Sequence, residues 1–86
     1  MKIKIKGKVW NFIRKKLENH KGYCESPNSK NKSIIVDSRL KGEEELEIIL
    51  HELLHAAFWF LDEEYVEEIS RDFAKILWTL NYRKEE

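Results

Sequence analysis

Residues 42–60 read GEEELEIILHELLHAAFWF, and this stretch predicts the longest element of the chain. Its apolar residues recur at spacings of three and four positions, which is the pattern of one helical face. The apolar face consists of Leu46, Ile49, Leu50, Leu53, Leu54 and Ala57. Three glutamates, Glu43–Glu45, fall in the first turn, where the helix dipole favours negative charge. We therefore expect a helix from about Glu43 to Phe58–Phe60.

Inside this helix, His51 and His55 stand four positions apart, so both imidazoles lie on one side, about one turn from each other. Both imidazoles can then bind one cation, while Glu52 lies beside the ion and is not one of its ligands. This HExxH pattern is typical of zinc peptidases, in which the glutamate is the general base. The alternative is a pair of histidines at the rim of the core that contact nearby glutamates. Core packing does not require this polar pattern, so the sequence predicts a Zn²⁺ site.

A catalytic zinc ion needs a third protein ligand and one open position for water. No histidine follows His55, and a cysteine ligand would have to be Cys24, which lies in a separate loop. The better source is the acidic stretch after Leu61. Its candidates are Glu63, Glu64, Glu67 and Glu68.

The geometry of an antiparallel helix pair narrows this choice. Helical side chains lean toward the N-terminus of their own helix, so the imidazoles are expected to place the ion near the level of residues 51–53. Counting back through the turn near residue 61, this level falls around residues 67–70 of the antiparallel partner, which favours Glu67 and Glu68 over the two earlier glutamates. We expect Glu68 as the third ligand, with Glu64 and Glu67 as alternatives. Asp72 lies one turn after Glu68 and is suited to accept the outer N–H of a ligating histidine.

The remaining elements follow from periodicity. Residues 1–8 alternate isoleucine with lysine, which predicts a Lys-rich edge strand. Residues 9–19 space their apolar residues as a short helix does, although VWNFI also fits a strand. Residues 23–24 and Ser33–Asp37 predict a hairpin, and a last helix is expected after Leu61 with Asp62 as N-cap. The predicted fold is α+β, in the order β-α-β-β-α-α, with a small sheet packed on the HExxH helix and a C-terminal helical hairpin.

Length and charge restrict the functional class. Eighty-six residues form one domain, residues 1–86, and the hydrophobic content of 42% is enough for one core. Residues 1–42 carry twelve Lys/Arg against three Asp/Glu, and residues 43–86 carry four against thirteen. The two halves are expected to attract each other, so nucleic-acid binding is the less favoured use of the basic half. A single cysteine, no apolar N-terminal segment and no bilayer-length apolar run predict a cytoplasmic protein without a membrane partner.

These residues resemble the gluzincin group of metallopeptidases, with HELLH on one helix and Glu68-Ile69-Ser70-Arg71-Asp72 matching the following ExxxD pattern. The resemblance implies His51, His55 and Glu68 as zinc ligands, Glu52 as general base and Asp72 as support for a ligand. It also implies a cleft strand, a place for Ile34–Asp37. The HELLHA, DEEYV and LW segments are further similar to those of small phage and bacterial HExxH proteins, and this resemblance implies a minimal zincin-like domain.

The predicted function is hydrolysis of a peptide or protein substrate by a zinc-activated water. Candidates for stabilising the oxyanion are Tyr23, Tyr65 and His20. The alternative is a non-catalytic interaction module in which zinc holds the two helices together. A metal-dependent nuclease is a third class, supported only by the basic half of the chain. The sequence predicts no oligomeric state.

Overall fold

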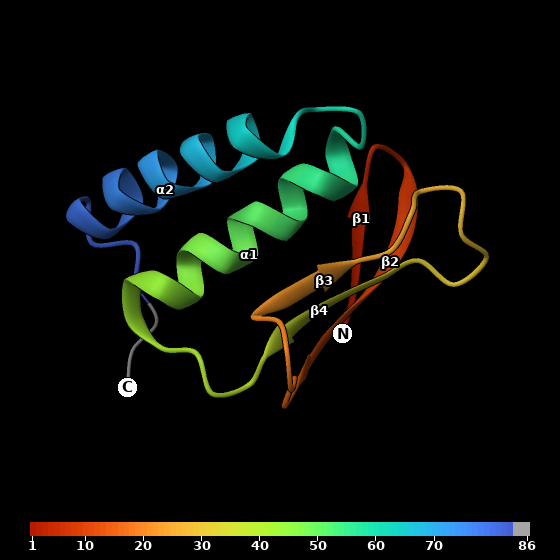
Figure 1. Cartoon of the computed structure of the whole chain (residues 1–86), viewed down its shortest axis with the longest axis horizontal. Helices are drawn as coiled ribbons and strands as arrows, with labels where there is room; N and C mark the ends of the chain where they lie inside the picture. Colours follow the sequence, from red (N-terminus) through yellow and green to blue (C-terminus); the bar gives the residue numbers. More distant parts are fainter. Residues whose placement is uncertain (84–86) are drawn as a thin grey trace.

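A four-stranded sheet carries the helix that holds the HExxH motif, as the computed structural model of residues 1–83 shows (Figure 1). The elements are β1 (Lys2–Ile5), β2 (Lys8–Lys15), β3 (Gly22–Cys24), β4 (Ser33–Asp37), α1 (Gly42–Ala57) and α2 (Glu63–Thr79). The strand order is β1-β2-β4-β3, with β2 and β4 parallel and the other pairs antiparallel. The predicted α+β class, the β3–β4 hairpin and the two C-terminal helices are confirmed.

The order predicted for the first half is wrong, because residues 8–15 form β2 and not a helix. Lys6 and Gly7 both have positive φ angles, 51° and 79°, in a two-residue turn that joins β1 to β2. Along β2, Trp10 and Phe12 are buried while their neighbours are exposed, which is a period of two. Pairing with β1 and β4 selects the strand over the helix that the apolar spacing suggested.

The core lies between the sheet and α1. Its buried cluster consists of Trp10, Phe12, Ile34, Val36 and Ala56. Lys6 Nζ donates to the carbonyl of Ala57 at 3.2 Å, which ties the β1–β2 turn to the end of α1. Helix α2 lies on the other side of α1 from β3 and β4 (Figure 1).

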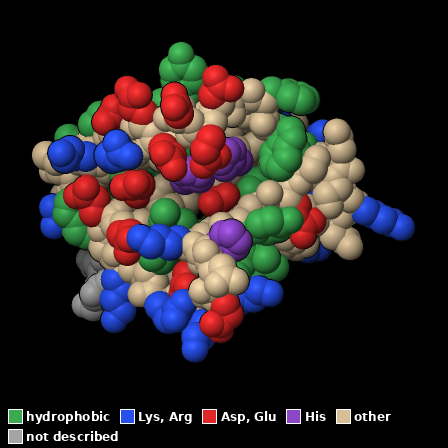
Figure 2. Space-filling view, viewed as in Figure 1, with side chains coloured by type: hydrophobic (Ala, Val, Ile, Leu, Met, Phe, Trp, Pro, Cys, Tyr) green, Lys and Arg blue, Asp and Glu red, His purple; other side chains and the backbone are tan. Residues whose placement is uncertain are grey.

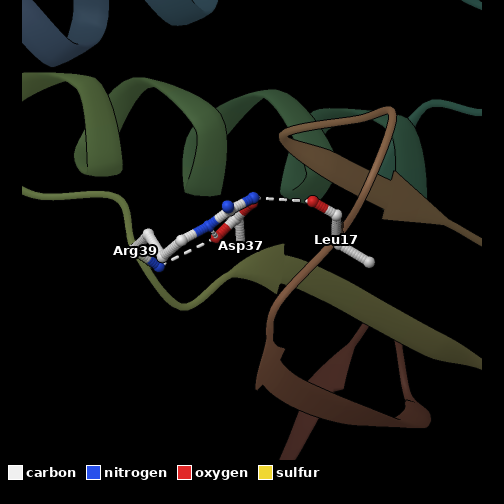
Figure 3. A network of polar contacts seen from close by, with 3 residues as sticks. All are labelled: Leu17, Asp37 and Arg39. Atoms are coloured by element: carbon white, nitrogen blue, oxygen red, sulfur yellow. Dashed lines mark hydrogen bonds and ion pairs between the residues drawn. The ribbon is translucent and has the colours of Figure 1, made fainter.

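The segment after β4 is held by one buried carboxylate (Figure 3). The Asp37 carboxylate accepts hydrogen bonds from the backbone N–H of Arg39 at 2.8 Å and from the Arg39 guanidinium at 2.6 and 3.0 Å. Arg39 Nη2 also donates to the carbonyl of Leu17 at 2.7 Å. These bonds connect the loop before β3 to the segment that enters α1, and they hold the pKa of Asp37 well below its usual range.

Helix α2 packs on α1 through small and β-branched residues. Val66, Ser70 and Ala74 are fully buried, and the small side chains of the last two let the helix axes approach closely. Asp62 stands at the N-cap, as predicted, but its side chain makes no capping hydrogen bond. No helix within residues 1–83 combines the length and hydropathy that crossing a membrane requires.

Candidate metal centre

Three side chains converge where the end of α1 meets the start of α2. Glu63 Oε1 lies 2.9 Å from His51 Nε2, and its Oε2 lies 2.9 Å from His55 Nε2. The two Nε2 atoms are 3.1 Å apart. One nitrogen or oxygen atom from each residue therefore falls within 4.8 Å of the others.

The local sequence explains this convergence. The spacing of four stacks the imidazoles on one side of α1, with side chains 16% and 18% exposed. A five-residue connection, 58–62, turns the chain back, so the first residue of α2 meets the last two turns of α1. Figure 2 shows acidic side chains gathered around these two histidines on the face where the helices meet.

The environment of His55 favours its neutral form. Burial lowers the pKa of His55; Glu63 opposes this shift, and the neighbouring His51 adds to it. A neutral imidazole offers a lone pair, the form that binds metals. If both Nε2 atoms carried protons for the carboxylate, two N–H groups would lie side by side 3.1 Å apart. A cation among the four atoms removes that repulsion.

Glu52 lies beside this group but does not belong to it. Its side chain is buried, and the residue is only 7% exposed. Burial, with a smaller contribution from Glu63, raises the pKa of its carboxyl to about 7. A carboxyl group with a pKa near neutrality can both accept and release a proton at the pH of a cell.

Strand β3 borders the carboxyl of Glu52 because its first residue has no side chain. A Cβ atom on Gly22 would lie 2.6 Å from Glu52 Oε2 and 2.9 Å from Ile48 Cγ2. The two histidines, Glu52 and Glu63 line a cavity of about 240 Å³ together with β3 and Trp59. The cavity is open to solvent at the exposed Glu63.

The structure brings Glu63 to the histidines, where the sequence led us to expect Glu68. Glu68 is exposed on α2 and does not belong to the converging group, and neither do Glu64 and Glu67. The expectation placed the ion near the level of residues 51–53. The Nε2 atoms in fact meet between His51 and His55, within reach of the first turn of α2. Within residues 1–83, no hydrogen bond joins Asp72 to either imidazole.

The other sequence candidates take different positions. Cys24 lines the cavity, but burial first, and then the charges of Glu52 and Glu25, raise the pKa of its thiol to about 12, so it remains protonated. Tyr23 lines the cavity as a residue of β3 and is half exposed. Tyr65 and His20 are exposed and do not line the cavity.

The resemblance assigned the cleft strand to Ile34–Asp37, and this is corrected. That segment is β4, which pairs with β2 on one side and β3 on the other. The strand that borders the cavity with an open edge is β3. Sequence reasoning also missed Trp59, whose only signal is its place four residues after His55.

Comparison of the chain with protein-family models, with curated proteins and with solved structures finds no match.

Proposed function

We propose that the protein is a minimal zinc-dependent metallopeptidase in which His51, His55 and Glu63 bind the ion and Glu52 is the general base. The observation that carries this proposal is the convergence of the two imidazoles and one carboxylate beside a buried carboxyl group. Glu63 replaces Glu68 as the proposed third ligand for this reason.

The spacing of these atoms fits zinc. Ligand atoms about 2.0–2.1 Å from a tetrahedral ion are separated from each other by about 3.3 Å. The separations here are 3.1 Å between the nitrogens and 2.9 Å from each nitrogen to a carboxylate oxygen. Two neutral imidazoles and one carboxylate are also the ligand set of several zinc hydrolases, which leave the fourth position to water. A small relaxation of side chains therefore suffices for binding.

Bound zinc would supply the Lewis acidity that lowers the pKa of water and polarises a carbonyl group. Glu52 supplies the proton transfer. Its carboxylate removes a proton from the attacking water and gives it to the amine that leaves when the peptide bond breaks. A nearby cation favours the ionised carboxylate, which is the form that acts as the base.

The open edge of β3 suits an extended peptide. The N–H of Glu25 donates to the carbonyl of Ser33, and the N–H of Asp37 donates to the carbonyl of Lys21. Lys21 and Glu25, the residues on either side of β3, therefore pair with β4. In an antiparallel ladder the pairing alternates, so the backbone N–H and C=O groups of Gly22 and Cys24 point away from β4. A substrate strand that pairs with these groups would run along the cavity that contains His51 and Glu52.

Substitution of Glu52 by glutamine tests the function. We expect Glu52→Gln to bind zinc as wild type does and to cleave a fluorogenic peptide library at least about 100-fold more slowly, because the base is lost. Glu67→Gln, which removes an exposed carboxylate on α2, is the control and should keep full activity. Equal cleavage by Glu52→Gln and wild type would contradict the proposal. Tight zinc binding without any cleavage by wild type would favour the interaction module.

A further inference from the structure

The apolar face of α1 is incompletely covered on the side away from the metal centre. A groove of about 670 Å³ lies between the inner face of the β1–β2 hairpin and the two helices. The residues that matter here are Ile3, Ile5, Phe12, Leu50, Leu54 and Phe73. Burial on this face is partial: α1 fully buries only Glu52 and Ala56.

The surface area of the chain supports a missing partner. A monomer of 10.4 kDa is expected to expose about 5,400 Å². This chain exposes 6334 Å², which is roughly 900 Å² more. A standard interface buries about 800 Å² on each partner. The excess is therefore of the size that one such interface covers.

A second apolar surface continues the groove along α2. Phe73, Ile76 and Leu80 follow one another at spacings of three and four and are 50%, 53% and 61% exposed. Phe73 belongs to both surfaces, since it also lines the groove. The two surfaces form one continuous apolar patch.

The charges around this patch are complementary. Arg14 lies at the groove, where its half-exposed side chain is next to Glu45, whereas Asp72 and Glu68 are exposed on α2 beside the apolar row. A helix that carries an apolar row and acidic neighbours therefore fits the groove, and α2 is such a helix.

We propose that the groove binds α2 of a second copy of this chain, which gives a dimer with two-fold symmetry. The apolar row of α2, formed by Phe73, Ile76 and Leu80, adjoins the groove at Phe73. A two-fold axis near Phe73 therefore places the row of each copy in the groove of the other. Leu50 and Leu54 line the groove, and each precedes a histidine of the candidate metal centre by one position. The groove and the histidines therefore lie about 100° apart around α1. No residue of the metal centre lines the groove, so the dimer leaves the cavity open to a substrate.

Sedimentation equilibrium of the full chain tests this inference. Wild type should show twice the mass of one 10.4 kDa chain at micromolar concentrations. Ile76→Lys should weaken the dimer at least about tenfold, because it places a charged side chain in an apolar groove beside Arg14. Val9→Lys is the matched control: Val9 is 54% exposed, as against 53% for Ile76, but lies outside the groove and should leave the mass unchanged.

A charge exchange provides a second measurement. Asp72→Lys and Arg14→Glu should each weaken the dimer, and the double variant should recover part of the loss. Circular dichroism would verify folding, with Leu80→Lys replacing Ile76→Lys if the latter unfolds, since Leu80 is 61% exposed. A monomeric wild type would overturn the proposal and leave the groove to a different acidic helix. A dimer that Ile76→Lys and Val9→Lys weaken equally would also overturn it.

Discussion

Gly22 shows how closely the sheet approaches the buried carboxyl group of Glu52. An added Cβ atom would lie 2.6 Å from Glu52 Oε2, well inside ordinary van der Waals contact. Either β3 or the Glu52 side chain would have to move to accept it. The missing side chain at this position therefore sets the distance between the open strand edge and the proposed general base.

We predict that Gly22→Ala lowers kcat/KM by about tenfold or more, because it displaces the base from its position. It should also lower the free energy of unfolding by about 1–3 kcal/mol through crowding against Glu52 and Ile48. Zinc affinity should change little, since neither side chain is a ligand. Peptide kinetics and chelator competition measure the two effects separately.

Lys21→Ala is the control for this substitution, since Lys21 precedes Gly22 and its side chain is 62% exposed. It should leave kcat/KM unchanged. An unaltered kcat/KM in Gly22→Ala would show that Glu52 adapts without cost, and would contradict the tight packing proposed here.

Residues at fixed spacing on one helix could be predicted from the sequence, and a residue from another helix could not. The positions of His51 and His55 depend only on the helical repeat, so their convergence follows from the motif. The position of Glu63 depends on where the connection ends and how α2 crosses α1, which no local pattern encodes. For that reason, counting residues back through the turn favoured Glu67 and Glu68 over Glu63.

At the scale of elements, β2 illustrates a competition between two periods. Val9, Phe12 and Ile13 fit a helix by spacing, whereas VWNFI is rich in β-formers. Residues 8–15 form a strand because β2 pairs with β1 on one side and with β4 on the other. Such pairings join residues distant in the sequence, as Phe12 with Ile34, and a single sequence does not reveal them. The hairpin of β3 and β4 was predictable because a turn-rich loop leads into the β-branched run Ser33–Asp37.

The Asp37–Arg39 pair makes the position of β3 sensitive to acid. Hydrogen bonds from Arg39 lower the pKa of Asp37 in the folded protein. A group with a lowered folded-state pKa contributes stability above its unfolded pKa of about 3.9, and that stability is lost as the pH falls below this value. Since Arg39 also bonds to Leu17, the loop before β3 should loosen in acid.

We predict that Asp37→Asn is less stable than wild type at pH 7, and that this difference shrinks as the pH falls below about 4. Urea unfolding at a series of pH values measures it. Glu67→Gln is the control, because this exposed carboxylate makes no comparable contact. A constant difference between Asp37→Asn and wild type at all pH values would mean that the charge of Asp37 does not stabilise the fold.

At the scale of the whole molecule, the chain has a small core for its size. Within residues 1–83, twelve large hydrophobic residues are exposed, whereas seven hydrophobic residues are buried. The buried indole N–H of Trp10 has no hydrogen-bond partner among residues 1–83, which costs about 1–3 kcal/mol. A domain of this size is marginally stable on its own, so a bound ion has a large relative effect.

We predict that zinc at about 100 times its Kd raises the free energy of unfolding by about 2.7 kcal/mol, because it binds the folded chain alone. The midpoint of thermal unfolding should then rise on the order of 10 °C. His51→Ala should abolish the shift and His20→Ala should retain it, since His20 lies outside the metal centre. Scanning calorimetry at one fixed protein concentration measures the effect, and an equal shift in both variants would point to a different binding site.

Zinc affinity, measured by chelator competition in two glutamate variants, tests the central claim most directly. Glu63→Gln and Glu68→Gln each remove one exposed carboxylate from α2, so the change in net charge is the same. We predict that Glu63→Gln weakens zinc binding at least about tenfold through loss of a ligand, while Glu68→Gln binds as wild type does. Unchanged affinity in Glu63→Gln, or a loss only in Glu68→Gln, would contradict the proposed metal centre.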